Sequence, residues 1–254
     1  MPGQTPSSLP EITFNYIEDD FITWLKYIVP GGLHPGNIQC FEYAIKNLPD
    51  ESPIVEIGTF AGLSTNIFSY YKWRYHKHNT LITCDRWIFE FAPFLTLGSA
   101  EALEAMKTIP VANTPISHAK YRQFVRDSYL RNTQMFAWES LPYTVELFSD
   151  EFFAEWEKQS LVPDVFARVI KLGGSIGFCY IDGNHSFEFT KRDFENCDKY
   201  LTVGGFILFD DSADGSTWGS AAFLQELVKT EVLEKQRYEV VMRNPNYLIR
   251  KIRS

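Results

Sequence analysis

Apolar residues recur along this chain in two patterns, short continuous runs and longer stretches with helical spacing. The continuous runs predict buried strands near 54–57, 80–87, 143–148, 176–182 and 206–209. The helical spacing predicts helices at about 11–29, 35–48, 64–76, 118–132, 150–158, 162–171, 187–200 and 217–234. Two closing strands, 238–243 and 247–252, flank the turn Asn244-Pro245-Asn246.

Strands and helices alternate over most of the 254 residues, which fits one large α/β domain. The alternation predicts a Rossmann-like, doubly wound and mostly parallel sheet with helices on both faces, and ligands at the carboxyl ends of its strands. Residues 1–50 are predicted to be a tail and helices covering the site, and residues 51–254 the main domain. An insertion at about 88–142, with a helical stretch near 99–107 and a loop at 110–117, would be either a lid or a structural flap.

Composition limits the function classes. Hydrophobic residues make up 45% of the chain, enough for a full core, and the net charge of −8 argues against a nucleic-acid surface. We find neither a signal peptide nor an apolar run of about 18 residues, so we expect a soluble protein without a membrane segment. The four cysteines are far apart; Cys84 and Cys179 lie in apolar runs and suit buried thiols, which favours an intracellular, cytoplasmic protein.

The segment from Ile54 to Ser64 predicts a strand, a glycine turn and the start of a helix. Gly58 and Gly62 lack a Cβ, so the backbone can approach a ligand closely there, and the helix start offers unpaired N–H groups. Pyrophosphate binding favours G-x-G-x-x-G, which this turn lacks, and Glu56 just before the turn suits a positively charged amino group better. Asp85 ends the next strand, where it can accept both hydroxyls of a ribose. An adenosine carrying an amino acid fits these demands better than a dinucleotide does.

A second acidic group follows two later strands. Asp182 and the pair Asp210-Asp211 end neighbouring strands, and three hard oxygen donors there suit Mg²⁺ or a similar cation. His185 follows three residues after Asp182 and is a candidate general base for a hydroxyl made acidic by that cation. The simpler alternative is that His185 caps the next helix and that Asp210-Asp211 only ends a strand.

These motifs together resemble a known family. The motif Glu56-x-Gly58-x-x-x-Gly62, with Asp85, Asp182-Gly-Asn-His185-Ser-Phe and Val203-Gly-Gly-Phe-Ile-Leu-Phe-Asp210-Asp211, is similar to the class I S-adenosylmethionine-dependent methyltransferases. The nearest branch contains metal-dependent O-methyltransferases of sugars and antibiotics, of the macrocin type. The resemblance covers about residues 50–252, and it implies a seven-stranded sheet with an antiparallel C-terminal strand.

The resemblance also implies roles for individual residues. The candidate cofactor-binding residues are Glu56, Gly58, Thr59, Gly62 and Ser64 for the methionine part, Asp85 for the ribose, Ser149 and Asp150 for the adenine, and Asp182. The candidate metal ligands are Asp182, Asp210 and Asp211, and the candidate catalytic residues are His185 and Asp182.

The function predicted from the sequence is therefore transfer of a methyl group from S-adenosylmethionine to a hydroxyl of a small molecule, a sugar or a phenol, assisted by Mg²⁺ or a similar cation. We place Trp218 at the acceptor pocket. The family analogy also suggests a homo-oligomer. Two alternatives stay open: a metal-independent methyltransferase, and a fold relative that binds ligands or catalyses a different, hydroxylase-like reaction.

Overall fold

A computed structural model describes residues 9, 19–88, 108–111, 114–137 and 141–254. The helical stretch expected near 99–107 and the first part of the helix expected from residue 11 lie outside these residues. Among the described residues, no helix is both long enough and apolar enough to cross a bilayer.

The centre of the molecule is a seven-stranded sheet with the strand order β10-β11-β9-β8-β1-β2-β5. All neighbouring pairs from β9 to β5 are parallel, whereas β11 is antiparallel to both of its neighbours. This confirms the predicted Rossmann-like sheet with its antiparallel C-terminal strand. The strands are β1 (Ile54–Ile57), β2 (Leu81–Cys84), β5 (Tyr143–Val145), β8 (Ile176–Ile181), β9 (Leu201–Phe209), β10 (Tyr238–Arg243) and β11 (Tyr247–Lys251).

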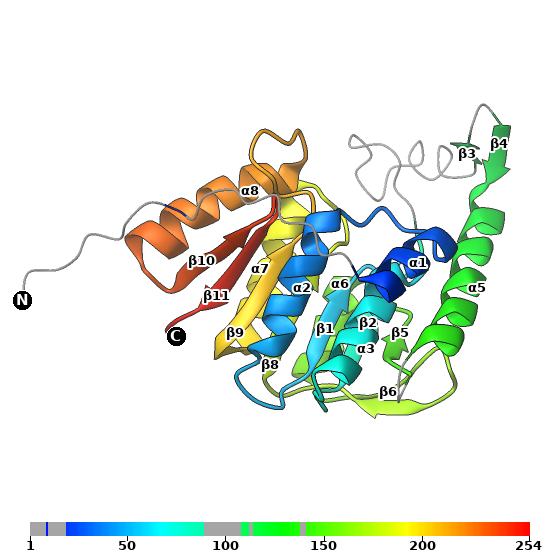
Figure 1. Cartoon of the computed structure of the whole chain (residues 1–254), viewed down its shortest axis with the longest axis horizontal. Helices are drawn as coiled ribbons and strands as arrows, with labels where there is room; N and C mark the ends of the chain where they lie inside the picture. The colour runs from blue at the N-terminus through cyan, green and yellow to red at the C-terminus, as the bar shows by residue number, and fades with distance from the viewer. Residues whose placement is uncertain (1–8, 10–18, 89–107, 112–113, 138–140) are drawn as a thin grey trace, which may run out of the picture.

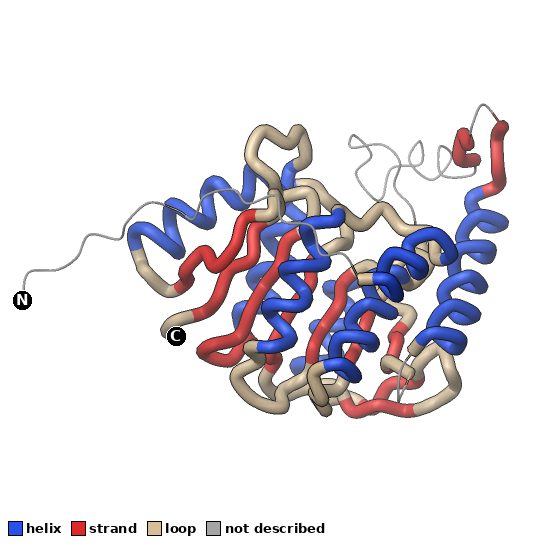
Figure 2. The backbone as a smooth tube through the Cα atoms, viewed as in Figure 1, coloured by secondary structure: helices blue, strands red, loops and turns tan. Residues whose placement is uncertain are grey.

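Helices cover both faces of this sheet (Figures 1 and 2), because successive strand side chains point to opposite faces and most of them are apolar. Ile54 and Phe178 pack into one buried cluster with α1, α2 and α3, while Val55 and Cys179 belong to a second cluster with α6, α7 and α8. The helices are α1 (Asp20–Ile28), α2 (Pro35–Lys46), α3 (Leu63–Arg74), α6 (Ser149–Glu157), α7 (Phe187–Tyr200) and α8 (Gly219–Leu227), which a π-helical segment, Val228–Glu234, continues.

The region 161–171 corrects a sequence-based prediction. The helix expected at 162–171 is instead a small hairpin of β6 (Leu161–Pro163) and β7 (Val169–Lys171). Asp164 follows β6, and its Oδ1 accepts hydrogen bonds from the backbone N–H groups of Phe166 and Arg168. A side chain that bonds its own following backbone favours a turn over a helix, and this local competition explains the wrong prediction.

The predicted insertion is described only in part. The loop expected at 110–117 is a two-stranded hairpin of β3 (Thr108–Val111) and β4 (Thr114–Ser117), so that prediction was wrong, whereas the helix expected from 118 is confirmed as α5 (His118–Phe136). Tyr129 and Val125 of α5 pack against Ala61 of the glycine turn and against Trp87. The helix therefore supports the turn from outside the sheet.

Candidate active site

The glycine turn joins β1 to α3 and lies against the end of β8. Gly58 has φ +84° and Gly62, the N-cap residue of α3, has φ +92°, a region that L-residues with a side chain rarely adopt. A Cβ on Gly58 would overlap the backbone carbonyl oxygen of Asp182. The absent side chain thus allows the predicted cofactor turn and the acidic end of β8 to meet.

Glu56 is completely buried directly beneath this turn. Its two carboxylate oxygens accept hydrogen bonds from the hydroxyls of Ser64 and Thr65, both in the first turn of α3. Burial nevertheless raises the pKa of Glu56 to about 8. Glu56 therefore orients the start of α3, and it can ionise when a positive charge binds above the turn.

We expect Glu56→Gln to flatten the pH dependence of stability. Between its ordinary pKa of 4.5 and about 8, Glu56 stays protonated in the folded chain and is ionised in the unfolded chain, so stability falls as pH rises through that window. The glutamine removes this loss, on the order of a few kcal/mol between pH 5 and 8. Urea unfolding at both pH values measures it, with Glu157→Gln on the surface of α6 as the control. Identical slopes for wild type and Glu56→Gln would contradict the prediction.

Asp85 follows β2 and clamps the glycine turn. Its Oδ2 accepts hydrogen bonds from the backbone N–H of Thr59 (2.8 Å), the Thr59 hydroxyl (3.1 Å) and the backbone N–H of Phe60 (3.0 Å). Its Oδ1 accepts one, from the backbone N–H of Trp87 at 2.6 Å. Because a carboxylate oxygen has two lone pairs, Oδ1 is the atom with capacity left for a ribose hydroxyl. The sequence did not predict this clamp.

The residues assigned to the adenine lie at the start of α6 and face α7. Ser149 forms a side-chain hydrogen bond with Asp193, a buried residue of α7 whose pKa is raised by burial to about 7. Asp150 pairs with Arg192 at 3.0 Å. Both side chains therefore already have partners from α7, and their contact with adenine stays a prediction.

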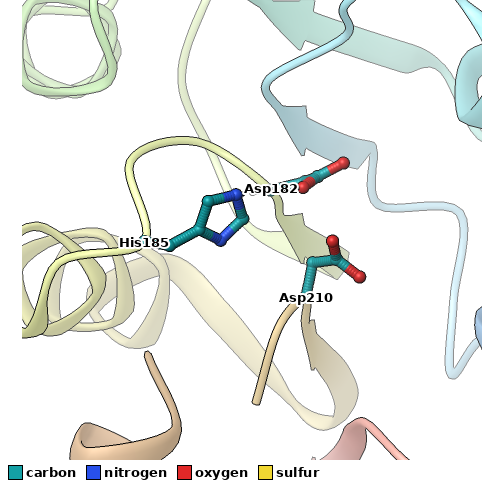
Figure 3. A group of neighbouring side chains, drawn as sticks. All are labelled: Asp182, His185 and Asp210. Atoms are coloured by element: carbon teal, nitrogen blue, oxygen red, sulfur yellow. Dashed lines mark ion pairs between the residues drawn. The ribbon is translucent and has the colours of Figure 1, made fainter. Parts of the chain in front are cut away.

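The acidic group predicted from the sequence does assemble at the carboxyl edge of the sheet (Figure 3). Asp182 directly follows β8, Asp210 directly follows β9 and His185 lies in the loop after β8; one ligand atom of each lies within 4.8 Å of the others. Burial and the neighbouring Asp210 carboxylate raise the pKa of Asp182 well above its usual range. Two carboxylates and an imidazole this close form a donor set suited to a divalent cation, whose positive charge would offset the repulsion between the carboxylates.

The capping alternative for His185 is wrong. The N-cap of α7 is Ser186, whose hydroxyl accepts a hydrogen bond from the backbone N–H of Phe189. The backbone carbonyl of His185 accepts from the N–H of Ser220 at the start of α8, which fixes the loop and leaves the imidazole available to the site.

The imidazole of His185 lies between two carboxylates. Its Nε2 is 3.7 Å from Oδ1 of Asp182 and its Nδ1 is 3.8 Å from Oδ2 of Asp211. Asp211 has φ +51° and is not a member of the compact group with Asp210. The ring of Trp218 lies 5.4 Å from the imidazole, centroid to centroid. His185 can therefore exchange a proton beside an aromatic side chain, with Asp211 as the outer carboxylate.

Three residues at this site carried no usable signal in the sequence. Asn37 of α2, Tyr180 of β8 and Asn246 of the β10–β11 turn are buried and hydrogen bonded to the acidic group. Asn37 and Tyr180 lie inside predicted elements and Asn246 in a predicted turn, so only the folded chain shows what they contact.

This combination of sheet order, glycine turn and acidic strand ends defines the class I methyltransferases, the class that the sequence resembled. A family model described as a methyltransferase domain matches residues 55–212, more than half of the chain, and the chain belongs to this family. A second model, a domain of unknown function, matches residues 175–251. A comparison with curated proteins found no match.

Solved structures share the fold at low sequence identity. The SAH-bound methyltransferase PaMTH1 of Podospora anserina is 12% identical with a TM-score of 0.53, over 93% of this chain and 89% of that one. The O-methyltransferase of Bacillus cereus in complex with SAH is 12% identical with a TM-score of 0.51, over 93% and 92%. TomG of Streptomyces achromogenes, an O-methyltransferase in complex with SAM, is 10% identical with a TM-score of 0.51, over 94% and 92%. At such identities these likenesses show the fold alone.

Proposed function

We propose that this protein transfers the methyl group of S-adenosylmethionine to a hydroxyl oxygen of a small molecule, assisted by a divalent cation such as Mg²⁺. The observation that carries the proposal is the compact group of Asp182, His185 and Asp210. It lies beside the glycine turn, because Gly58 contacts the backbone of Asp182. A cofactor in the turn and an acceptor at the acidic group would thus be neighbours.

The glycine turn supports S-adenosylmethionine as the methyl donor. Buried Glu56 lies beneath the turn, where the positively charged amino group of the methionine end would favour its ionised form, and Oδ1 of Asp85 retains a lone pair for the ribose. Two of the structures that share this fold are O-methyltransferases with SAM or SAH bound. Together these observations favour this cofactor over a dinucleotide.

The chain's residues then have separate tasks. Asp182 and Asp210 would hold the cation, which supplies positive charge that orients the acceptor hydroxyl and lowers its pKa. His185 takes the hydroxyl proton, and Asp211 stabilises the resulting imidazolium. S-adenosylmethionine supplies the methyl group: the acceptor oxygen forms the new bond to carbon while the carbon–sulfur pair returns to sulfur, leaving S-adenosylhomocysteine. The remaining rate enhancement comes from holding the methyl donor and the acceptor hydroxyl in line.

Trp218 supports a small, flat or ring-shaped acceptor. Its side chain lies next to His185 and is 46% exposed, so its ring is accessible to an acceptor. An exposed indole beside a base can stack on a sugar ring or a phenol. We therefore propose a sugar or phenol hydroxyl as the acceptor.

Calorimetric titration with S-adenosylhomocysteine tests this proposal first. We expect one site per chain with micromolar affinity, on the order of −8 kcal/mol, and weaker binding for Asp85→Ala, with Asp127→Ala on the surface of α5 as the control. No binding at millimolar ligand would overturn the proposal. Once binding is established, a screen of sugar and phenol hydroxyls for methyl transfer identifies the acceptor.

A metal-independent methyltransferase is the second candidate. The specific observation in its favour is that His185 lies within 4 Å of a carboxylate on each side, so the two carboxylates can orient the imidazole toward an acceptor hydroxyl without a cation. Turnover in the presence of excess EDTA separates the two mechanisms. Loss of activity that Mg²⁺ restores supports the metal-assisted reaction, and unchanged activity supports the second candidate.

A further inference from the structure

Asp210 is held by two buried amides that lie far from it in the sequence. Nδ2 of Asn37 lies 2.5 Å and Nδ2 of Asn246 lies 2.9 Å from the same oxygen, Oδ1 of Asp210. Asn37 and Asn246 are 0% and 1% exposed. On the neighbouring strand, the hydroxyl of Tyr180 donates to Oδ2 of Asp182 at 3.1 Å and accepts from Nδ2 of Asn37 at 3.3 Å.

The orientation of both amides follows from their other partners. Oδ1 of Asn246 accepts the backbone N–H groups of Ser212 (2.9 Å) and Ala213 (3.1 Å), so its Nδ2 must face the opposite way. That Nδ2 donates to Oδ1 of Asn37 at 3.0 Å, which turns the NH₂ group of Asn37 toward Asp210. The network therefore has one arrangement in which each donor meets an acceptor.

The network fills both lone pairs of one oxygen of Asp210. Two N–H donors fill both lone pairs of Oδ1 of Asp210, which leaves Oδ2 as the oxygen available to a ligand. On Asp182, Oδ2 accepts one hydrogen bond, from Tyr180, and Oδ1 lies toward His185. Asp210 cannot offer both oxygens to one cation unless it loses a hydrogen bond inside the core.

The two asparagines come from parts of the chain outside the residues that match the methyltransferase family. Asn37 lies in the first turn of α2, directly after Pro35-Gly36, and a Cβ on Gly36 would overlap the carbonyl of Asn244 in the β10–β11 turn. The close approach of α2 to this turn brings both amides to the end of β9. The N-terminal helices thus reach the acidic group through this contact.

We propose that Asn37 and Asn246 are positioning residues that restrict Asp210 to one-oxygen coordination and thereby make the site select Mg²⁺ over Ca²⁺. Mg²⁺ takes six oxygen ligands in a tight octahedron, commonly single carboxylate oxygens and waters, whereas Ca²⁺ takes up to eight and accepts carboxylates through both oxygens. The restriction costs Ca²⁺ a ligand and leaves Mg²⁺ unaffected. This inference rests on the metal-assisted function proposed above.

Separate calorimetric titrations with MgCl₂ and CaCl₂ test the inference, with wild type, Asn37→Leu, Asn37→Ala and Asn79→Ala. Leucine removes the N–H donors of Asn37 and fills their space, which keeps water out. If the Asn37→Leu variant does not fold, Asn37→Ala is titrated in its place. Circular dichroism identifies the folded variants. Asn79 is the matched control, since it is buried and its amide donates to the carbonyls of Asp50 and Ser52 at the opposite edge of the sheet.

We expect wild type and Asn79→Ala to bind Mg²⁺ more tightly than Ca²⁺. In the Asn37 variants, the dissociation constant for Ca²⁺ divided by that for Mg²⁺ should fall about tenfold or more. An unchanged ratio, or a wild type that binds Ca²⁺ as tightly as Mg²⁺, overturns the inference and leaves the proposed function standing. A wild type that binds neither ion removes the metal from the proposed function and this inference with it. If both Asn37 variants unfold, Asn246→Ser is titrated in the same way.

Discussion

Gly58→Ala should destabilise the protein by about 3 kcal/mol or more and abolish S-adenosylhomocysteine binding. The added Cβ would overlap the backbone carbonyl of Asp182, and the residue would be forced to keep φ +84°. Relief of the overlap requires β1 and β8 to separate at the edge where the cofactor turn lies. Urea unfolding measures the stability, and calorimetry at low temperature measures the binding.

Gly215→Ala is the matched control for this variant. Gly215 also has a positive φ, +77°, but among the residues that the structure describes none beyond its chain neighbours has an atom within 4 Å of the position that its Cβ would take. The Gly215→Ala variant therefore loses stability only through backbone strain, about 1 kcal/mol, and its affinity for S-adenosylhomocysteine should be unchanged. Equal losses of stability in the two variants would show that the contact with Asp182 contributes nothing.

Asp182→Asn should reduce methyl transfer by about 10³-fold while cofactor affinity changes only a few-fold. The substitution keeps the size of the side chain and removes the negative charge that would hold the cation beside Asp210. It also removes the repulsion by Asp210 and the cost of burying a charge, which together raise the pKa of Asp182, so the unliganded variant should be more stable than wild type at pH 8. Initial rates with the acceptor found in the screen, calorimetry with S-adenosylhomocysteine and urea unfolding measure the three effects.

The His185→Ala variant distinguishes a residue that binds the cation from a residue that takes the hydroxyl proton. If His185 is the base, this variant loses turnover and retains Mg²⁺ affinity, whereas Asp182→Asn loses both. Full turnover in Asp182→Asn would exclude the metal-assisted mechanism. A loss of Mg²⁺ affinity in His185→Ala as large as in Asp182→Asn would instead make the imidazole the third metal ligand.

The sequence by itself determined the class of fold and the edge where the site lies. Apolar runs and helical spacing are local, so strands such as 54–57 and helices such as 187–200 follow from neighbouring residues alone. Acids that end parallel strands must meet at one edge, and this placed Asp182 and Asp210 together before any contact was known. The glycine turn was predictable for the same local reason.

Only the tertiary structure decided what each site residue contacts. The hydrogen bonds that fix Asp210 span 173 residues to Asn37 and 36 to Asn246, and the two asparagines are 209 residues apart. Asp85 holds its own glycine turn, and Ser186 rather than His185 caps α7. Such partners depend on how α2, the β10–β11 turn and the sheet pack together, and residues this distant leave no periodic or spacing signal along the chain.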